Sequence, residues 1–70
     1  MKLKINGEIK SIDTSQENLS LSIVISKLGL NPKLIVVEFN GVIINRDQWD
    51  KQNIKNGDVL EIVTIVGGGS

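Results

Sequence analysis

Three Asn-Gly dipeptides limit what this chain can fold into more than any other feature of its sequence. Asn6-Gly7, Asn40-Gly41 and Asn56-Gly57 each lie between apolar stretches. Asparagine and glycine both tolerate the positive φ angles of tight turns, so each dipeptide is predicted to reverse the chain. Three such turns within 70 residues imply at least four short strands. A strand-rich fold with tight connections is therefore expected.

The segment of residues 2–12 is predicted to form the first hairpin, and two registers are possible. A two-residue loop would place Leu3 opposite Lys10. A type I turn with a bulge at Gly7 would instead pair Leu3 with Ile9. We favour the bulge, because it keeps two apolar side chains on one face of the hairpin.

One helix is predicted after residue 20, from apolar residues at helical spacing, which are Leu21, Val24, Ile25 and Leu28. Ser20 can cap its first turn, Gly29 can end it in a left-handed conformation, and Pro32 prevents its continuation. The alternation of apolar residues in 21–25 and their β-branched content would also suit a strand. We favour the helix, because both boundary signals agree with the apolar stripe.

Two strands of the predicted sheet are expected to be central. Residues 34–39 are too uniformly apolar for a two-faced surface strand, and residues 59–66 carry apolar side chains on both sides. Residues 42–44 form a short strand between them in the chain. Residues 45–49 are predicted to be a loop or a short helical turn, in which Trp49 plugs the edge of the core.

The resulting order ββαβββ predicts an α+β fold, a mixed sheet wrapped around one helix, because single apolar faces must cover each other. This arrangement is the ubiquitin-like fold known as the β-grasp. The sheet residues expected to face the helix are Leu3, Val36, Leu60 and Ile62. We expect the β-grasp domain to span residues 1–66, followed by a flexible glycine-rich tail of residues 67–70.

Composition excludes several classes of function. Eight basic and eight acidic residues give a net charge of zero, so no general attraction to nucleic acid or to an anionic membrane is expected. Cysteine and histidine are absent, which excludes disulfides, thiol nucleophiles, Ser-His pairs and thiolate or imidazole metal sites. No signal segment and no apolar run of membrane-spanning length is evident, so the cytoplasm is the expected location.

The acidic residues give no pattern of an acid-base site. They are scattered along the chain and are expected to be solvated: Asp13, Glu17, Glu38, Asp47, Asp50, Asp58 and Glu61. A domain of this size buries only about 60% of its unfolded surface, so a deep catalytic cleft is not expected either.

The chain ends in three glycines and a serine, directly after the predicted last strand. Such an arm has almost no side-chain bulk and could enter a narrow channel on another protein. The plain alternatives are a frayed terminus or the start of a Gly-Ser linker. A phosphate-binding loop is excluded, because no Lys-Ser/Thr pair and no helix follow the glycines.

Several segments together resemble the ThiS family, the sulfur carrier proteins of thiamine biosynthesis, and the similarity covers essentially the whole chain. The segments are Asn40-Gly41, Ile43 to Trp49, Asn56-Gly57-Asp58 with the strand that follows, and Val66-Gly67-Gly68-Gly69. The most specific features are Arg46 with Trp49 three residues later, Gly57-Asp58 before the last strand, and the terminal valine with three glycines.

The resemblance implies a carrier that other enzymes act upon, and not a catalyst. In such proteins a ubiquitin-activating-type enzyme uses ATP to adenylate the C-terminal glycine carboxylate. Sulfur from a cysteine desulfurase persulfide then displaces AMP, and the thiocarboxylate supplies thiazole synthase. The chain itself is expected to bind no cofactor, since ATP and zinc belong to the partners.

The implied reactive residue is Gly69, with Val66, Gly67 and Gly68 threading into the partner. This chain departs from the family pattern because Ser70 follows Gly69. Ser70 must therefore be removed before Gly69 offers a free carboxylate.

Three other functions are compatible with the pattern. The sulfur carriers of molybdopterin synthesis share the fold and the chemistry but normally end in two glycines, so the triple glycine and the segment from Arg46 to Trp49 favour the thiamine family. A ubiquitin-like modifier would join its tail to an amine of a target protein. A plain β-grasp interaction module would have no chemistry at its tail.

Overall fold

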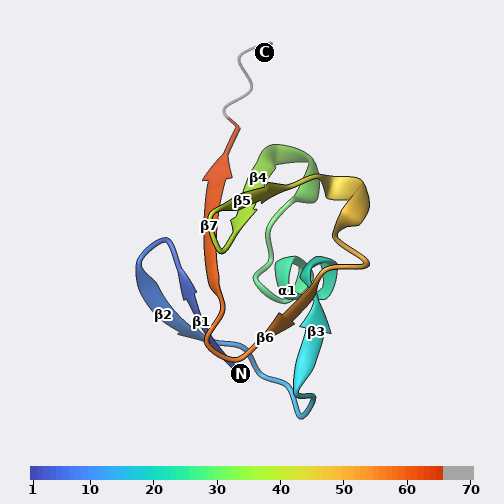
Figure 1. Cartoon of the computed structure of the whole chain (residues 1–70). Helices are drawn as coiled ribbons and strands as arrows, with labels where there is room; N and C mark the ends of the chain where they lie inside the picture. Colours follow the sequence, from blue (N-terminus) through green and yellow to red (C-terminus); the bar gives the residue numbers. More distant parts are fainter. Residues whose placement is uncertain (66–70) are drawn as a thin grey trace.

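The computed structural model describes residues 1–65, which form a five-stranded sheet with one helix against one of its faces (Figure 1). In spatial order the strands are β2 (Glu8–Ser11), β1 (Lys2–Ile5), β7 (Val59–Thr64), β4 (Ile35–Phe39) and β5 (Val42–Ile44). The helix is α1 (Leu21–Lys27). The remaining elements are the short strands β3 (Asn18–Ser20) and β6 (Asn53–Lys55) and the 3-10 helices η1 (Pro32–Leu34) and η2 (Arg46–Gln48).

The five-stranded sheet has the predicted topology. Strands β1 and β7 run parallel, whereas the other neighbouring strands run antiparallel, so the sheet is mixed. Its five strands and α1 follow one another in the predicted order ββαβββ, and β4 and β7 are both interior strands. The inner face of the sheet and the apolar side of α1 cover each other, which is the β-grasp arrangement.

The register of the first hairpin was predicted wrongly. Leu3 lies opposite Lys10, as a two-residue loop requires, and the preferred bulge is absent. Asn6 and Gly7 have φ angles of 52° and 82°, so both adopt the left-handed conformation of a type I′ turn. Ile9 consequently faces away from the core with 67% of its surface exposed. The twist of a type I′ turn matches the twist of two paired strands. This match outweighs the extra apolar contact that the bulge would provide.

The helix forms where its boundary signals predicted it. The Ser20 hydroxyl accepts a hydrogen bond from the Ile23 amide at 3.3 Å, which caps the first turn. Gly29 has a φ of 74° and ends the helix in the left-handed conformation. Pro32 then begins η1 instead of continuing α1. The alternative strand over residues 21–25 is therefore excluded.

The core lies between α1 and the inner face of the five-stranded sheet. It consists of Leu3, Ile5, Ile12, Leu19, Leu21, Val24, Ile25, Ile35, Val37, Trp49, Ile54 and Leu60, with Leu28 and Ile62 among the partly buried residues packed against it. Val36 was wrongly placed in this core, since its neighbours Ile35 and Val37 are the buried residues of β4. An uninterrupted apolar run does not reveal which alternate residues face inward.

Strands β3 and β6 were not predicted. They pair with each other in a separate two-stranded sheet, where Leu19 lies opposite Ile54. Each strand has only three residues and a single buried side chain, so its sequence carries no recognisable alternation. The Asn56-Gly57 turn therefore connects strands of two different sheets and does not form a hairpin.

The region of Trp49 has the predicted form. Residues 46–48 form η2, and the Trp49 side chain that follows is buried in the core. Its Nε1–H donates a hydrogen bond to the Ile44 carbonyl oxygen at 3.0 Å. The indole thus joins η2 to the end of β5 while filling the edge of the core.

Within residues 1–65, no helix is long and apolar enough to cross a membrane. The predicted division into a domain of residues 1–66 and a tail of residues 67–70 lies at the limit of the described residues and stays a prediction.

Candidate functional site

Strand β7 leads directly into the predicted reactive tail. It lies in the middle of the sheet, between β1 and β4, and runs away from the end of the molecule that holds the N-terminus (Figure 1). After β7 ends at Thr64, the Ile65 amide still donates a hydrogen bond to the Leu34 carbonyl oxygen at 2.6 Å. The chain is therefore held by the neighbouring segment up to the last described residue.

The predicted site residues themselves lie outside the described part of the chain. They are Val66, Gly67, Gly68, Gly69 and Ser70. Their roles in threading and sulfur transfer stay predictions.

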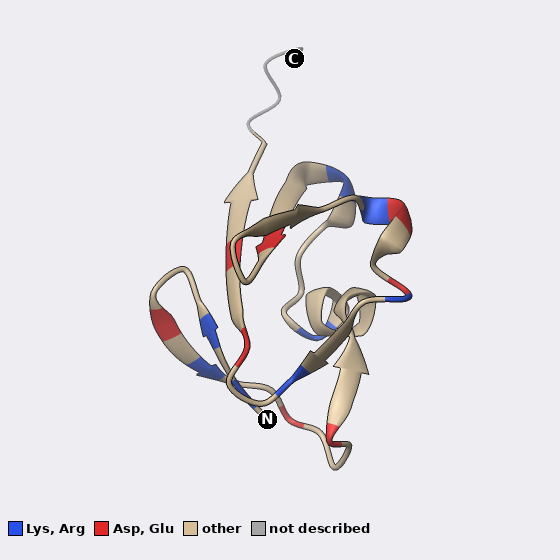
Figure 2. Cartoon of the chain, in the orientation of Figure 1, with Lys and Arg blue, Asp and Glu red and all other residues tan. Residues whose placement is uncertain are grey.

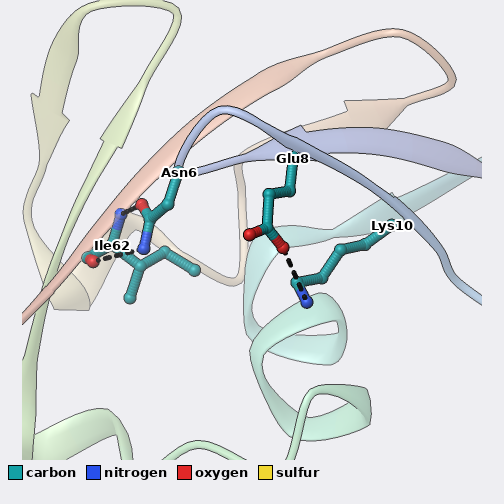
Figure 3. Close-up of polar contacts among 4 residues, drawn as sticks. All are labelled: Asn6, Glu8, Lys10 and Ile62. Atoms are coloured by element: carbon teal, nitrogen blue, oxygen red, sulfur yellow. Dashed lines mark hydrogen bonds and ion pairs between the residues drawn. The ribbon is translucent and has the colours of Figure 1, made fainter.

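The side chain of Asn6 holds β7 where β1 has already turned away. Its Oδ1 accepts a hydrogen bond from the Ile62 amide at 2.7 Å, and its Nδ2 donates to the Ile62 carbonyl oxygen at 3.0 Å (Figure 3). The Asn6 amide also donates to the Leu60 carbonyl oxygen at 3.0 Å. One turn residue thus continues the ladder of hydrogen bonds along the edge of β7.

Asn40 does the same from the other side of β7. Its Oδ1 accepts a hydrogen bond from the Val59 amide at 3.0 Å, and its own amide donates to the Val59 carbonyl oxygen at 2.9 Å. The sequence indicated only the turn-forming role of these asparagines. Their second role was not predicted, because it depends on which strand lies next to each turn.

Two of the residues that carry the family resemblance have structural roles. Asp58 is buried, and its Oδ2 accepts a hydrogen bond from the Lys55 amide at 2.8 Å, which closes the turn around Gly57. Trp49 fills the core edge, as described above. Arg46 differs from both, because it is exposed on η2.

The side of the sheet that faces away from α1 is partly apolar. We call this surface the outer face, and at its centre lie Val36, Glu38, Ile43, Glu61 and Val63. Ile43 and Val63 expose 62% and 59% of their surfaces. Exposed apolar side chains that adjoin one another are typical of surfaces that bind other proteins.

Two glutamates lie opposite each other at the centre of the outer face. Glu38 on β4 is the direct cross-strand partner of Glu61 on β7, and acidic segments of the two strands lie side by side in Figure 2. From sequence both were expected to be scattered, solvated residues, because only the register of β4 against β7 places them opposite each other. Like charges at such positions destabilise a sheet.

Neither glutamate has an ion-pair partner within the described residues. The one ion pair of residues 1–65 joins Lys10 to Glu8 on the first hairpin, with 3.8 Å between Nζ and Oε1 (Figure 3). Lys4, on the neighbouring strand β1, lies beside Val59 and not beside Glu61. Among residues 1–65, no cation therefore forms an ion pair with either glutamate.

The described surface shows no arrangement typical of an enzyme site. Two depressions of about 340 and 310 Å³ are present, and Asp13 is the only carboxylate that lines either of them. Among residues 1–65, no group of three acidic side chains could hold a metal ion. Within this part of the chain, the features that stand out are the base of the tail and the outer face.

Comparisons with known proteins agree on one family. Residues 3–69 match the ThiS family. The sulfur carrier protein ThiS of Bacillus subtilis is 30% identical over 67 residues, which cover 96% of this chain and 98% of that protein. A thiazole synthase of Paramagnetospirillum magneticum is 34% identical over 70 residues, but the chain spans only 21% of that protein.

A solved structure supports the same assignment. The crystal structure of the thiamine biosynthesis protein ThiS from Geobacter metallireducens superposes with a TM-score of 0.84 at 31% sequence identity, covering 99% of this chain and 100% of that one. The predicted β-grasp fold is thus confirmed by a relative as well as by the topology of the sheet. On sequence and on fold, the chain belongs to the ThiS family.

Proposed function

We propose that this chain carries sulfur for thiazole formation in thiamine biosynthesis, as a thiocarboxylate on its C-terminal glycine. The observation that carries the proposal is the likeness over nearly the whole length of the chain to a ThiS sulfur carrier protein. ThiS sulfur carrier proteins are small carriers and not enzymes.

The chemistry needs a partner because a carboxylate resists attack by a nucleophile. An adenylating enzyme of the ubiquitin-activating type transfers AMP from ATP to the Gly69 carboxylate and releases pyrophosphate. A persulfide sulfur, supplied by a cysteine desulfurase, then attacks the acyl carbon and AMP leaves with its electron pair, which gives an acyl disulfide. A thiol of a partner attacks the S–S bond of this intermediate, so the thiocarboxylate leaves and the thiol ends in a disulfide with the cysteine that carried the persulfide. Positioning the two reacting groups supplies much of the remaining acceleration. ATP is used by the partner, and this chain supplies only the acyl group.

The fold agrees with a carrier in which β7 is held firmly in the domain and a thin C-terminal tail reaches the partner. β7 is held along both edges, by Asn6 and Asn40 and by the hydrogen bond from Ile65 to Leu34. A firmly held strand fixes the position and direction of the chain up to Ile65. We propose that residues 67–70 form the arm, because glycines have the least bulk to pass through a narrow channel.

The partners that we propose are the adenylating enzyme, the cysteine desulfurase and thiazole synthase. The thiazole synthase from Paramagnetospirillum magneticum supports the last of these, since about a fifth of that protein matches the whole of this chain. A carrier-like segment within a thiazole synthase chain is the arrangement expected when the two must meet. We propose the cytoplasm, where ATP is available, as the place of the reaction.

The state of the terminus provides the test. With Ser70 attached, the Gly69 carbonyl is a peptide amide and offers no carboxylate to adenylate. A chain ending at Gly69 should exchange oxygen for sulfur when it is incubated with the adenylating enzyme, ATP and the sulfur donor, whereas the chain ending at Ser70 should do so only after trimming. Intact-mass analysis of both chains in parallel gives the answer.

A chain ending at Gly68 serves as the control for tail length. It keeps a terminal glycine carboxylate but is shorter by one residue. It should therefore react poorly if the channel of the adenylating enzyme requires a tail of fixed length. A stable conjugate with another protein would indicate a modifier. Efficient thiocarboxylate formation on an untrimmed chain would show that the reactive end is not Gly69.

A further inference from the structure

The three Asn-Gly dipeptides have different surroundings, although they are identical in sequence. Asn-Gly is prone to deamidation, because glycine has no side chain to keep its backbone nitrogen away from the asparagine carboxamide. The asparagine and the glycine of all three dipeptides are exposed, so water can reach each of them. The dipeptides differ in the hydrogen bonds that hold the two groups that must react.

The reaction needs a free nucleophile and a free leaving group. The nucleophile is the backbone nitrogen of the glycine, which loses its proton to solvent base and attacks the side-chain Cγ of the asparagine. The leaving group is Nδ2, which takes up a proton and departs as ammonia. The new N–Cγ bond closes a succinimide ring. Water then opens the ring at Cγ to give aspartate, or at the backbone carbonyl carbon to give isoaspartate.

In the first and the third dipeptide, one of these two groups is held. Nδ2 of Asn6 donates a hydrogen bond to the Ile62 carbonyl oxygen at 3.0 Å, while Oδ1 accepts one from the Ile62 amide (Figure 3). In the third dipeptide the Gly57 amide donates to the Lys2 carbonyl oxygen at 2.8 Å, and Oδ1 of Asn56 accepts from the Lys2 amide at 2.8 Å. Two hydrogen bonds must therefore break before either dipeptide can react.

Asn40-Gly41 differs from both. One hydrogen bond holds its carboxamide, in which Oδ1 accepts from the Val59 amide at 3.0 Å. Within residues 1–65, neither Nδ2 of Asn40 nor the Gly41 amide donates a hydrogen bond. The turn leads into β5, a strand of three residues at the edge of the sheet, where β4 is its described neighbour. Short edge segments open locally at low cost, which lets the Gly41 nitrogen approach Cγ.

We propose that Asn40 is the preferred site of spontaneous deamidation in this chain, and that the folded structure protects Asn6 and Asn56. The reaction consumes water and releases ammonia, and it needs no other reactant. Either product adds a negative charge to a chain whose net charge is zero. Aspartate keeps an oxygen that can accept from the Val59 amide. Isoaspartate instead lengthens the backbone of the turn by a methylene group, which disturbs the pairing of β5 with β4.

Peptide mapping follows all three sites in one sample. Trypsin cleaves after lysine and arginine, so the dipeptides fall in the separate peptides 5–10, 34–46 and 56–70. The full chain is incubated at mildly alkaline pH in water labelled with heavy oxygen, and each hydrolysed succinimide then carries a labelled oxygen. Fragmentation distinguishes Asn40 from Asn45, which lies in the same peptide. A parallel sample in concentrated guanidinium chloride gives the three rates in the unfolded chain.

We expect the folded chain to deamidate about fivefold or more faster at Asn40 than at Asn6 or Asn56, since one more hydrogen bond must break at each of the other sites. In the unfolded chain the three rates should agree closely, because these hydrogen bonds are gone. Asn40→Gln would have to close a larger ring, so it should remove the signal of Asn40 and leave the other two rates unchanged.

A second measurement concerns the product. The Ile44 carbonyl at the end of β5 accepts the hydrogen bond of the Trp49 indole, so a disturbed β5 loosens the edge of the core. The purified isoaspartate form should therefore unfold at a lower temperature than the Asn40→Asp variant, which has the same charge and an unaltered backbone. Equal unfolding temperatures would contradict the assigned effect on β5.

Three results would overturn the preferred site. They are equal rates at the three sites of the folded chain, a faster rate at Asn6 or Asn56, and a preference for Asn40 that persists in guanidinium chloride. The last result would mean that the preference comes from the neighbouring sequence and not from the fold. No partner enzyme takes part in these measurements, so their outcome is independent of sulfur transfer.

Discussion

The two sides of strand β7 differ sharply although their sequences look similar. Leu60 and Ile62 face α1 and contribute to the core, whereas Glu61 and Val63 on the alternate positions lie on the outer face. Within residues 1–65, α1 is the only α-helix that can cover the sheet, so one face is buried. The comparison shows that stability resides on the inner side of β7, while the apolar groups of its outer side are free for recognition.

The largest effect on the inner side should come from Trp49→Ala. The indole is buried with 3% of its surface exposed and makes a hydrogen bond to Ile44. Its removal leaves a cavity and an unpaired carbonyl, so the free energy of unfolding should fall by about 3–5 kcal/mol. Chemical denaturation measures the loss. Gln48→Ala, an exposed neighbour in η2, should change stability little, and an equal effect there would contradict the assignment.

The most direct test of the difference between the two sides of β7 uses two residues of this strand. Leu60 is fully buried, so Leu60→Ala should cost about 2–5 kcal/mol. Val63 exposes 59% of its surface, and Val63→Ala should cost within about 0.5 kcal/mol. Parallel urea titrations of the two variants provide the measurement. Similar losses in both would mean that the outer face also supports the fold.

Substitutions that affect the edge of β7 should lower the free energy of unfolding less than substitutions on its inner face. Asn6→Gly retains a residue that accepts a positive φ but removes both side-chain hydrogen bonds to Ile62, so a loss of about 1–2 kcal/mol is expected. Thermal unfolding should shift by roughly 4–8 °C for each kcal/mol in a domain of this size. Asn6→Asp keeps the acceptor for the Ile62 amide, so its loss should be smaller. A loss equal to that of Asn6→Gly would contradict this account of the edge.

The smallest effect is expected on the outer face, with the opposite sign. Glu61→Gln removes the repulsion with Glu38 and should raise the free energy of unfolding by about 0.2–1 kcal/mol. The gain should shrink as salt is added, because salt screens exposed charges. Thermal unfolding at low and high salt measures both changes. A lower stability than wild type at low salt would show that the glutamates do not repel each other in the free chain.

The helix was predictable because its signals are local. Ser20 and Gly29 mark its ends within one turn, and the apolar stripe between them identifies its buried side. The hairpin register and the position of Val36 were not predictable in the same way. Both depend on which neighbouring strand completes the pairing, and an apolar run satisfies either choice.

The same distinction applies to the candidate site, where some features follow from single residues and others depend on strand pairing. The terminal glycines were recognisable because their backbone freedom is a property of the residues themselves. The hydrogen bonds from Asn6 to Ile62 and the pairing of Glu38 with Glu61 across β4 and β7 join residues that are far apart in the chain. No short-range pattern marks either of them.

The sequence by itself determined the turns, the helix, the class of fold and the family, because these follow from conformational preferences and spacings of nearby residues. Tertiary structure alone decided which side of β4 and β7 is buried, and therefore which charges meet on the outer face. The physical reason is that strand side chains alternate with a period of two. A shift of one residue in pairing exchanges the two faces, and only packing against α1 selects between them.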